Sequence, residues 1–479
     1  MLIFSYSLDL EGAEYSFVHF VQKIEYFKSL YLNSFEFPFT NCVYNPFYPY
    51  FIWMIAKVVK LDFIKDIHSI FIIGRSISFV FVFIQIFYLV KFIHLFEKNK
   101  TIVLLGVLLY LLLITGHFYA MRPDSMVTTL FSVFVFETVA NFYQDARKLY
   151  WLKAAVLILI MTLLKQDFIL HIFLFLGILF LLKRTKISFY ALLFSVVLVV
   201  CSYVVLYAIF GEAYLCNTVL FNFQVTSNVR ESYNLVTVAI SICRILPLLV
   251  LSIILYTKYE NKNNKNLLSL FLIAGFFEFI ICHLLMFRAG SFINYSYVTI
   301  LYLIIACCIF LQISSFNKYF SLVLFLGYLC GIIGTNILLK NYVTSIPALR
   351  NEKNIYEQKL QSRKELLDYV GKDLLFMPYP KNCIFLFSPN LIYGYDFHID
   401  KYLYLVTGFA SSTKLAYVKS DKYDTYFNSG KLKYILLEND LKNESYIQKY
   451  YPNYKLTDTV NIYQVFSFTE NKKLINSTK

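Results

Sequence analysis

Apolar residues occur in long, nearly unbroken runs through the first 340 positions of the chain. Most runs have roughly 17–25 residues, the length that a helix needs to cross the hydrocarbon core of a bilayer. Each run predicts a membrane-spanning helix, because a segment in lipid must satisfy its backbone hydrogen bonds internally. The predicted spans are Ile72–Phe96, Ile102–Ala120, Ser125–Tyr143, Trp151–Leu164, Phe168–Leu182, Phe189–Phe210, Leu235–Thr257, Leu267–Met286, Tyr295–Ile313 and Phe320–Leu339.

The segment before these spans has a different pattern. Apolar residues at helical spacing between Glu14 and Leu32 predict an amphipathic helix lying on the membrane surface. The Pro-containing stretch Tyr44–Tyr50 opens a short apolar helix that is expected to end near Lys60. Met1–Ser7 is too short to cross a bilayer, so any export or anchoring helix that preceded Asp9 would be missing from this numbering.

Beyond Lys340 the apolar runs become short and are bounded by Pro, Asn or Asp. Such runs are typical of strands, and two stretches between them have helical patterns. The sequence therefore predicts a transmembrane domain over residues 1–341, with residues 8–70 as its first outer loop, and a C-terminal α/β domain over residues 342–479. The expected strands are Cys383–Phe387, Lys433–Leu437 and Asn461–Val465, and the expected helices are Asn354–Tyr369 and Glu444–Tyr451.

The loops between the spans alternate in charge. Loops at residues 97–100, 147–153, 183–186, 258–265 and 318 are basic, whereas the alternate loops carry only Arg122, Lys165, Arg230 and Arg288. Positively charged loops stay in the cytoplasm. The Asp9 region and everything after the last span are therefore predicted to lie outside, as in a protein of the bacterial inner membrane.

Composition agrees with an integral membrane protein. Of the 479 residues, 58% are hydrophobic and only 15% are charged, a proportion that no soluble domain of this size needs. The net charge of +14 lies largely in the short loops, so nucleic acid is not a predicted partner. The nine cysteines contain no C-x-x-C pair and are interpreted as small core residues.

Acids and cations gather on the predicted outer side. Asp9, Glu11 and Glu14 lie at the head of the chain, and the outer loops hold the four cations named above. Breaking the anomeric bond of a polyprenyl-phosphate sugar leaves a phosphate that fixed cations stabilise, and an acceptor hydroxyl needs a carboxylate to take its proton. We expect Glu11 or Asp9 to be that base, and Arg122, Lys165, Arg230 and Arg288 to bind the donor phosphate.

Each of these residues also has a simpler interpretation. The acids are compatible with solvation of a surface helix, and Arg122 with Asp124 is compatible with a snorkelling cation and a helix cap. Arg244 lies inside a span, where an unpaired cation is costly, so it either faces a cavity or its span begins later. Its candidate partners are His171, Glu278 and His283.

The order of these features resembles the GT-C superfamily of membrane glycosyltransferases. The likeness is strongest to bacterial relatives of protein O-mannosyltransferases (glycosyltransferase family 39), lipid A aminoarabinose transferases and lipopolysaccharide-core transferases. The resemblance is carried by Asp9-Leu10-Glu11-Gly12, Tyr44-Asn45-Pro46-Phe47-Tyr48-Pro49, Gly74-Arg75, Arg122-Pro123-Asp124, Lys165-Gln166 and Asn294-Tyr295.

This resemblance implies a GT-C fold, a polyprenyl-phosphate sugar donor and inversion at the anomeric carbon. It places the catalytic carboxylate at Asp9 or Glu11, with Asp124, Gln166, Tyr44, Asn294 and Tyr295 in supporting positions. The acceptor would be a glycolipid, a glycan or a protein. No cofactor is predicted, and the need for a divalent metal stays open. The alternatives are a transporter or flippase for a lipid-linked saccharide, and a glycan polymerase.

Overall fold

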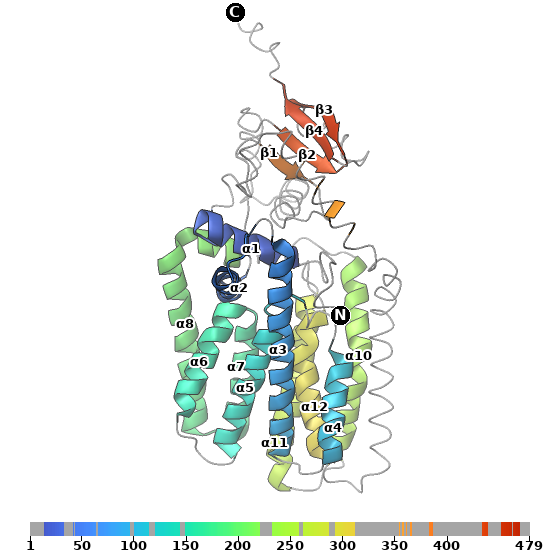
Figure 1. Ribbon diagram of the computed structural model, residues 1–479. Coiled ribbons are helices and arrows are strands. Elements are labelled where there is room, and N and C mark those ends of the chain that lie inside the picture. The colour runs from blue at the N-terminus through green and yellow to red at the C-terminus, as the bar shows by residue number, and fades with distance from the viewer. Residues whose placement is uncertain are drawn as a thin grey trace, which may run out of the picture.

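The chain forms a helical bundle, two short helices lying across one end of that bundle, and a small sheet beyond them (Figure 1). The computed structural model describes residues 14–32, 42, 44–63, 66–95, 100–114, 120–143, 149–220, 232–257, 262–286, 293–311, 354, 357, 358, 361, 365, 383–386, 434–438, 452–461 and 463–469. The bundle consists of α3 (Ile67–His94), α4 (Lys100–Leu113), α5 (Asp124–Tyr143), α6 (Tyr150–Leu164), α7 (Phe168–Lys183), α8 (Lys186–Leu215), α10 (Ser232–Thr257), α11 (Lys262–Met286) and α12 (Tyr297–Leu311).

These helices coincide with the first nine spans predicted from the sequence. Within the described part, four of them are long and apolar enough to cross a membrane, namely α3, α5, α8 and α11. The others are shorter apolar helices. The predicted span over residues 320–339 lies outside the described residues.

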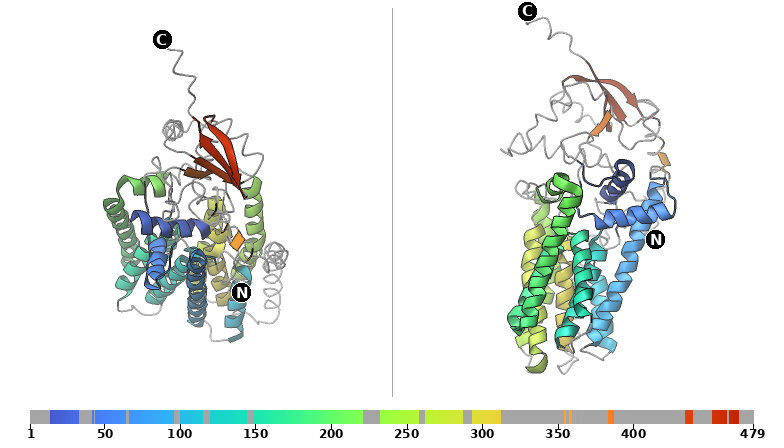
Figure 2. Two further views of the ribbon diagram at one scale, coloured as in Figure 1. Left: turned by 45° about the horizontal axis from the view of Figure 1, so that its top comes forward. Right: turned by 90° about the vertical axis from the view of Figure 1, so that its left-hand side faces the viewer.

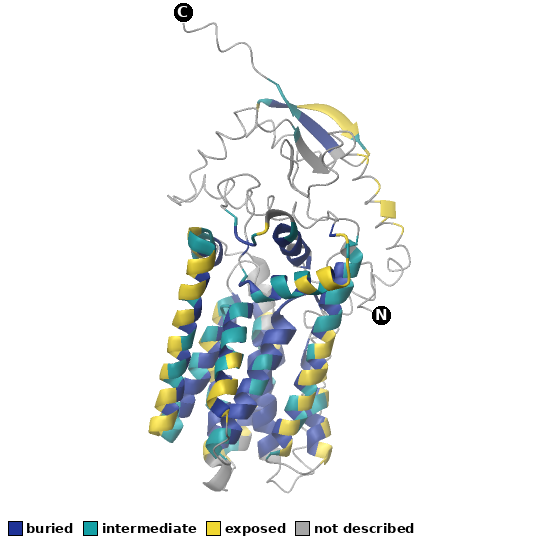
Figure 3. Cartoon of the chain, turned by 60° about the vertical axis from the view of Figure 1, so that its left-hand side comes forward, coloured by how far each residue is buried: buried dark blue, intermediate teal, exposed yellow. Residues whose placement is uncertain are grey.

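The outer helices carry apolar side chains on the surface of the bundle. Along α8, Leu193, Val197, Val200 and Val204 follow one another at helical spacing and are each about half exposed (Figure 3). A continuous apolar stripe of this kind is stable against lipid chains and unfavourable in water. The chain is therefore an integral membrane protein.

Two helices cover one end of the bundle. Helices α1 (Glu14–Phe27) and α2 (Phe47–Val58) run across the ends of the bundle helices rather than along them (Figures 1 and 2). The sequence predicted that the first helix would reach Leu32. It ends earlier because Lys28 adopts a left-handed conformation with φ 56°, which stops a helix.

The C-terminal part contains a four-stranded sheet on the same side of the bundle as α1 and α2 (Figure 1). Its order is β1-β2-β4-β3, with β1 parallel to β2 and the other pairs antiparallel. The strands are β1 (Cys383–Leu386), β2 (Tyr434–Glu438), β3 (Tyr454–Val460) and β4 (Tyr463–Phe468).

Three of these strands match the sequence prediction, and β3 was missed. Most of the β3 side chains are exposed, so the strand lacks the apolar alternation that predicts a half-buried strand. The described residues between 354 and 365 are helical, as expected. The expected helix over residues 444–451 and the domain boundary at residues 341–342 lie outside the described residues.

Candidate active site

A buried ion triad lies where the loops before α5 and after α6 meet. Asp124, the first residue of α5, accepts from Arg122 Nε through Oδ2 at 3.0 Å and from Lys165 Nζ through Oδ1 at 2.9 Å. All three side chains are buried. Asp124 therefore joins two cations that are 43 positions apart, and it is not the flanking cap residue of α5.

The turn between α6 and α7 positions Lys165 and brings in two further groups. Lys165 ends α6 in an extended conformation, and its carbonyl accepts from Phe168 N at 3.2 Å as α7 begins. Tyr295 donates its hydroxyl to Asp167 Oδ2 at 2.9 Å, and Lys165 Nζ lies 4.6 Å from the centre of the Tyr295 ring. Residues from three separate loops thus surround the Lys165 ammonium.

The electrostatics of the triad favour a charged lysine. Burial lowers the pKa of Lys165, but the attraction of Asp124, with Tyr295 and Asp167, outweighs burial and raises that pKa above its ordinary value. An ammonium has three N–H donors, and among the described residues Lys165 Nζ donates to Asp124. The buried ammonium is therefore suited to receive an additional anion.

Tyr44 lies beside the triad. Burial raises the pKa of the Tyr44 phenol, and Arg122, Asp124 and Lys165 all lie close enough to act on it. Its backbone carbonyl accepts from the hydroxyl of Tyr31 at 2.8 Å, which fixes the loop that leads into α2. Tyr44 and Tyr295, both expected in supporting positions, are therefore close to Lys165.

A second buried ion pair joins α1 to α3, and its carboxylate also binds the loop that carries Arg122. Glu14 accepts from Arg75 Nε at 2.9 Å and from Arg75 Nη2 at 2.6 Å, and its Oε1 also accepts from Met121 N at 2.7 Å. Met121 packs so closely on Gly74 that a Cβ added there would lie 2.2 Å from its Cγ. Glu14, one of the three head-end acids, is thus committed to three hydrogen bonds.

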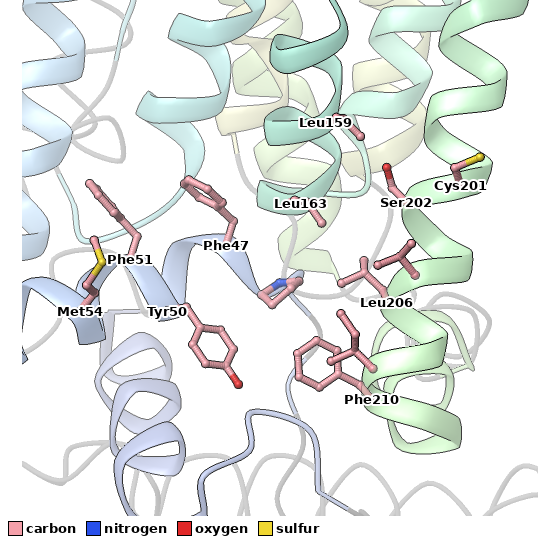
Figure 4. A pocket seen from close by; sticks show the side chains of 13 residues that line it. Phe47, Tyr50, Phe51, Met54, Leu159, Leu163, Cys201, Ser202, Leu206 and Phe210 are labelled. Atoms are coloured by element: carbon pink, nitrogen blue, oxygen red, sulfur yellow. The ribbon is translucent and has the colours of Figure 1, made fainter.

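An apolar groove lies between α2, α6 and α8. It has a volume of about 560 Å³ and is lined by side chains of α2, α6 and α8 together with Pro46 (Figure 4). This volume lies in the range of small-molecule and lipid sites. Its lining residues are Pro46, Phe47, Tyr50, Phe51, Met54, Leu159, Leu163, Cys201, Ser202, Val205, Leu206, Ile209 and Phe210.

The groove and the triad share the same chain segments. Leu163 lines the groove and lies two residues before Lys165, and Pro46 lines it two residues after Tyr44. Asn45 ties these segments together, because its Nδ2 donates to the carbonyl of Thr162 at 2.5 Å. The groove and the triad are therefore built on neighbouring residues of the same two segments.

Among the described residues, the polar groups inside the bundle make several separate contacts. His171 Nδ1 lies 2.6 Å from Glu278 Oε2, which links α7 to α11. Arg244, buried within α10, donates to the carbonyl of Leu113 at the end of α4, and the ring nitrogen Nδ1 of His283 lies 2.5 Å from the carbonyl of Phe279. Since α10 begins at Ser232, Arg244 does lie well inside its helix.

The other predicted site residues are not tested by the described structure. Gln166 follows Lys165 and is half-buried. Asn294 lies in the short 3-10 helix η4 (Ile293–Ser296), and its side chain is outside the described part. Asp9, Glu11, Arg230 and Arg288 also lie outside the described residues. Among the residues that are described, no group of three or more His, Cys, Asp or Glu side chains could hold a metal ion.

No family model and no curated protein sequence matches this chain. Its structure is similar to the crystal structure of ArnT from Cupriavidus metallidurans bound to undecaprenyl phosphate, with a TM-score of 0.59 and 11% sequence identity over 98% of this chain and 96% of that one. The apo state of ArnT gives a TM-score of 0.53 at 11% identity. ArnT is a lipid A aminoarabinose transferase with a GT-C fold, so the fold class predicted from the sequence is confirmed.

Proposed function

We propose that this chain is a membrane glycosyltransferase that moves a sugar from a polyprenyl-phosphate donor to a hydroxyl of an extracytoplasmic acceptor, with inversion. The observation that carries the proposal is an apolar groove whose lining segments, around Pro46 and Leu163, also lead to the Arg122–Asp124–Lys165 triad. A prenyl chain needs an apolar channel, and the phosphate at its end needs fixed cations. The ArnT structure that contains undecaprenyl phosphate supports this donor class.

The triad supplies the electrostatic part of the reaction. The leaving polyprenyl phosphate gains negative charge as the anomeric bond breaks, and buried cations stabilise that charge more strongly than exposed ones do. Arg122 can hold phosphate oxygens in a fork, and Lys165 provides a point charge. Asp124 keeps both cations in place before the donor arrives. Arg230 and Arg288 remain proposed as further phosphate ligands.

The base is proposed to be Glu11 or Asp9. Glu14 is anchored beside Arg122 through Arg75 and Met121. Glu11 precedes Glu14 by three residues, so an extended chain keeps it within about 11 Å of that anchor. Asp9 is two residues further from Glu14. The short reach from Glu14 supports a role for Glu11 or Asp9 next to the triad, where one of them would take the proton of the acceptor hydroxyl.

We also propose that the triad and the C-terminal sheet face the outside of a bacterial inner membrane. The loop charges support this orientation through the positive-inside rule. The acceptor is then a glycolipid, a glycan or a protein of the cell envelope.

The test is a transfer assay with the purified full-length protein and a labelled polyprenyl-phosphate sugar. Wild type should release polyprenyl phosphate, and Glu11→Gln or Asp9→Asn should lower the rate by roughly 10²–10⁴-fold if that residue is the base. Lys57→Gln is a matched control, since Lys57 pairs with Glu25 on the same side of the bundle. Normal transfer by both acid variants would mean that the base is assigned wrongly.

A transporter of lipid-linked saccharides is the second candidate. The ionisable residues inside the bundle, Arg244, Glu278 and His171, are the observation in its favour, because such residues often line transport pathways. The same assay separates the two functions. A transporter would move the labelled donor across proteoliposomes with its sugar–phosphate bond intact.

A further inference from the structure

The side chain of Asn45 makes two buried hydrogen bonds just before α2 begins. Its Nδ2 donates to the carbonyl of Thr162 at 2.5 Å, and its Oδ1 accepts from the hydroxyl of Tyr214 at 3.1 Å. Asn45 and Tyr214 are both fully buried. A backbone carbonyl can only accept, so the amide nitrogen faces Thr162 and the amide oxygen faces Tyr214. One amide thus joins the start of α2 to α6 and α8, and these are the three helices that line the groove.

The hydrogen bond to Thr162 stabilises the end of α6. Carbonyls in the last turn of a helix have no amide partner within that helix. The chain leaves the helical path at Lys165, which is extended with φ −154° and ψ 118°. Asn45 supplies a donor to the Thr162 carbonyl, three residues before this lysine of the triad. The position of α2 relative to Lys165 therefore depends on the Asn45 amide.

Tyr214 also holds the segment that leads into α2. The ring centres of Tyr214 and Tyr31 lie 5.1 Å apart, and the Tyr31 hydroxyl donates to the carbonyl of Tyr44 at 2.8 Å. Tyr214 follows Gly211, whose φ of 63° and ψ of −153° are open essentially only to glycine and interrupt the helical backbone of α8. Phe210, directly before this break, lines the groove. The end of α8 therefore lines the groove before the break and binds the segment before α2 after it.

Along the chain, Asn45 lies between residues of the groove and residues beside the triad. Pro46 follows it and lines the groove. Tyr44 precedes it, and all three charged residues of the triad lie close enough to act on the Tyr44 phenol. The same order recurs at the end of α6, where Leu163 lines the groove and Lys165 belongs to the triad. The Asn45 amide thus fixes these two segments against each other.

A prenyl phosphate uses both parts of such a site at once. Linking two binding groups raises affinity far above that of either group only where the geometry allows both to bind together. A shift of α2 against α6 leaves each part intact for a ligand that uses only one of them. The same shift weakens a ligand that must reach both. A residue that fixes the relative position of the two parts therefore acts on ligand selection.

We propose that Asn45 is a positioning residue that sets the relative position of the groove and the triad, so that the protein selects long-chain over short-chain prenyl phosphates. This inference rests on the proposed function, in which the groove holds the prenyl chain and the triad holds the phosphate. Asn45 acts through Pro46, Tyr44 and the end of α6. Specificity for the lipid carrier then comes from simultaneous binding of chain and phosphate.

The test measures the binding of three probes to the purified full-length protein by isothermal titration. Dimethylallyl phosphate presents the phosphate on a single prenyl unit, a polyprenol presents the chain without phosphate, and polyprenyl phosphate presents both. Wild type should bind polyprenyl phosphate at least about 10²-fold more tightly than either other probe. Asn45→Leu removes both hydrogen bonds at similar volume. It should weaken polyprenyl phosphate binding at least about tenfold and leave the affinities of the other two probes unchanged.

Tyr214→Phe is the milder variant, because it removes one of the two hydrogen bonds and keeps the ring. It should weaken polyprenyl phosphate binding by a smaller factor, with the other two probes again unchanged, and it decides the test if Asn45→Leu does not fold. Tyr256→Phe is the matched control. The Tyr256 hydroxyl bonds Ser269 between α10 and α11, which do not line the groove, so this variant should bind all three probes as wild type does.

Equal losses for all three probes would show a merely structural role for Asn45 and overturn the proposal. Unchanged polyprenyl phosphate binding in Asn45→Leu and Tyr214→Phe would overturn it as well. The binding measurements need no sugar transfer, so the proposed function can fail separately. A wild type that binds the three probes as expected but releases no polyprenyl phosphate from a polyprenyl-phosphate sugar would contradict the transfer reaction and not the role of Asn45.

Discussion

Asp124 pairs with both cations of the triad, and the sequence predicted its side of the membrane but not this pairing. The sequence indicated that Arg122, Asp124 and Lys165 lie on one side of the membrane, because loop charge fixes topology. It did not show that one carboxylate bridges both cations, since Asp124 and Lys165 are 41 positions apart. Pairing over such distances depends on helix packing, which apolar periodicity does not encode.

Replacing Asp124 by Asn should make donor binding sensitive to alkaline pH. Asp124 is the main influence that raises the pKa of Lys165 against burial. Without it, burial dominates and the folded pKa falls, so the ammonium loses its proton at a lower pH. Polyprenyl-phosphate affinity of Asp124→Asn should decline at mildly alkaline pH, where wild type still binds, as a pH series would measure. Asp66→Asn is the control, and identical profiles for all three proteins would refute the role of Asp124.

The pairing of α1 with α3 is the main contact at the scale of elements. The sequence placed a surface helix after Glu14 and a span containing Arg75, but it gave no reason to join them. The structure joins them through the fully buried Glu14–Arg75 ion pair. Met121 also packs against α3, because Gly74 has no Cβ to keep it away. The start of α1 is thereby fixed beside the loop that carries Arg122.

Glu14→Ala should destabilise the protein by about 3–5 kcal/mol, because it removes the carboxylate to which the buried Arg75 guanidinium donates two hydrogen bonds. The double variant Glu14→Ala with Arg75→Met should lose less than the sum of the two single variants. Chemical unfolding of the four proteins in detergent measures this coupling. Additive losses would show that the two residues act independently.

The groove between α2, α6 and α8 was not visible in the sequence, because its lining residues are ordinary apolar residues of three separate helices. If it holds the prenyl chain, Val205→Trp should fill it and weaken polyprenyl-phosphate binding. Val204→Trp is a close control, since Val204 is exposed on the same helix and does not line the groove. Equal binding by both variants would remove the groove from the donor site.

At the scale of the whole molecule, the pattern of apolar runs was sufficient to predict the architecture. Nine predicted spans match described helices, because an apolar segment in lipid must satisfy its backbone hydrogen bonds internally and therefore forms a helix. The C-terminal sheet was predicted less completely. Most side chains of its strand β3 are exposed, so the alternation of apolar and polar residues that predicts a half-buried strand is absent there.

Orientation is a prediction for the whole chain. An alkaline phosphatase reporter fused after Lys479 should be active in a bacterial host, because the C-terminal sheet is predicted to lie outside. A fusion after Lys183 should be inactive, since the basic loop there is predicted to stay in the cytoplasm. The reverse pattern would place the triad on the cytoplasmic side and exclude an extracytoplasmic acceptor.

The central claim is that the triad binds a lipid-linked phosphate, and the most direct test is the affinity of the purified full-length protein for polyprenyl phosphate. Wild type and Lys57→Gln should bind it equally well. Lys165→Met should bind at least about tenfold more weakly, because loss of a charge-assisted hydrogen bond costs about 1.5–3 kcal/mol. Equal affinity of Lys165→Met and wild type, or no binding by wild type, would contradict the account.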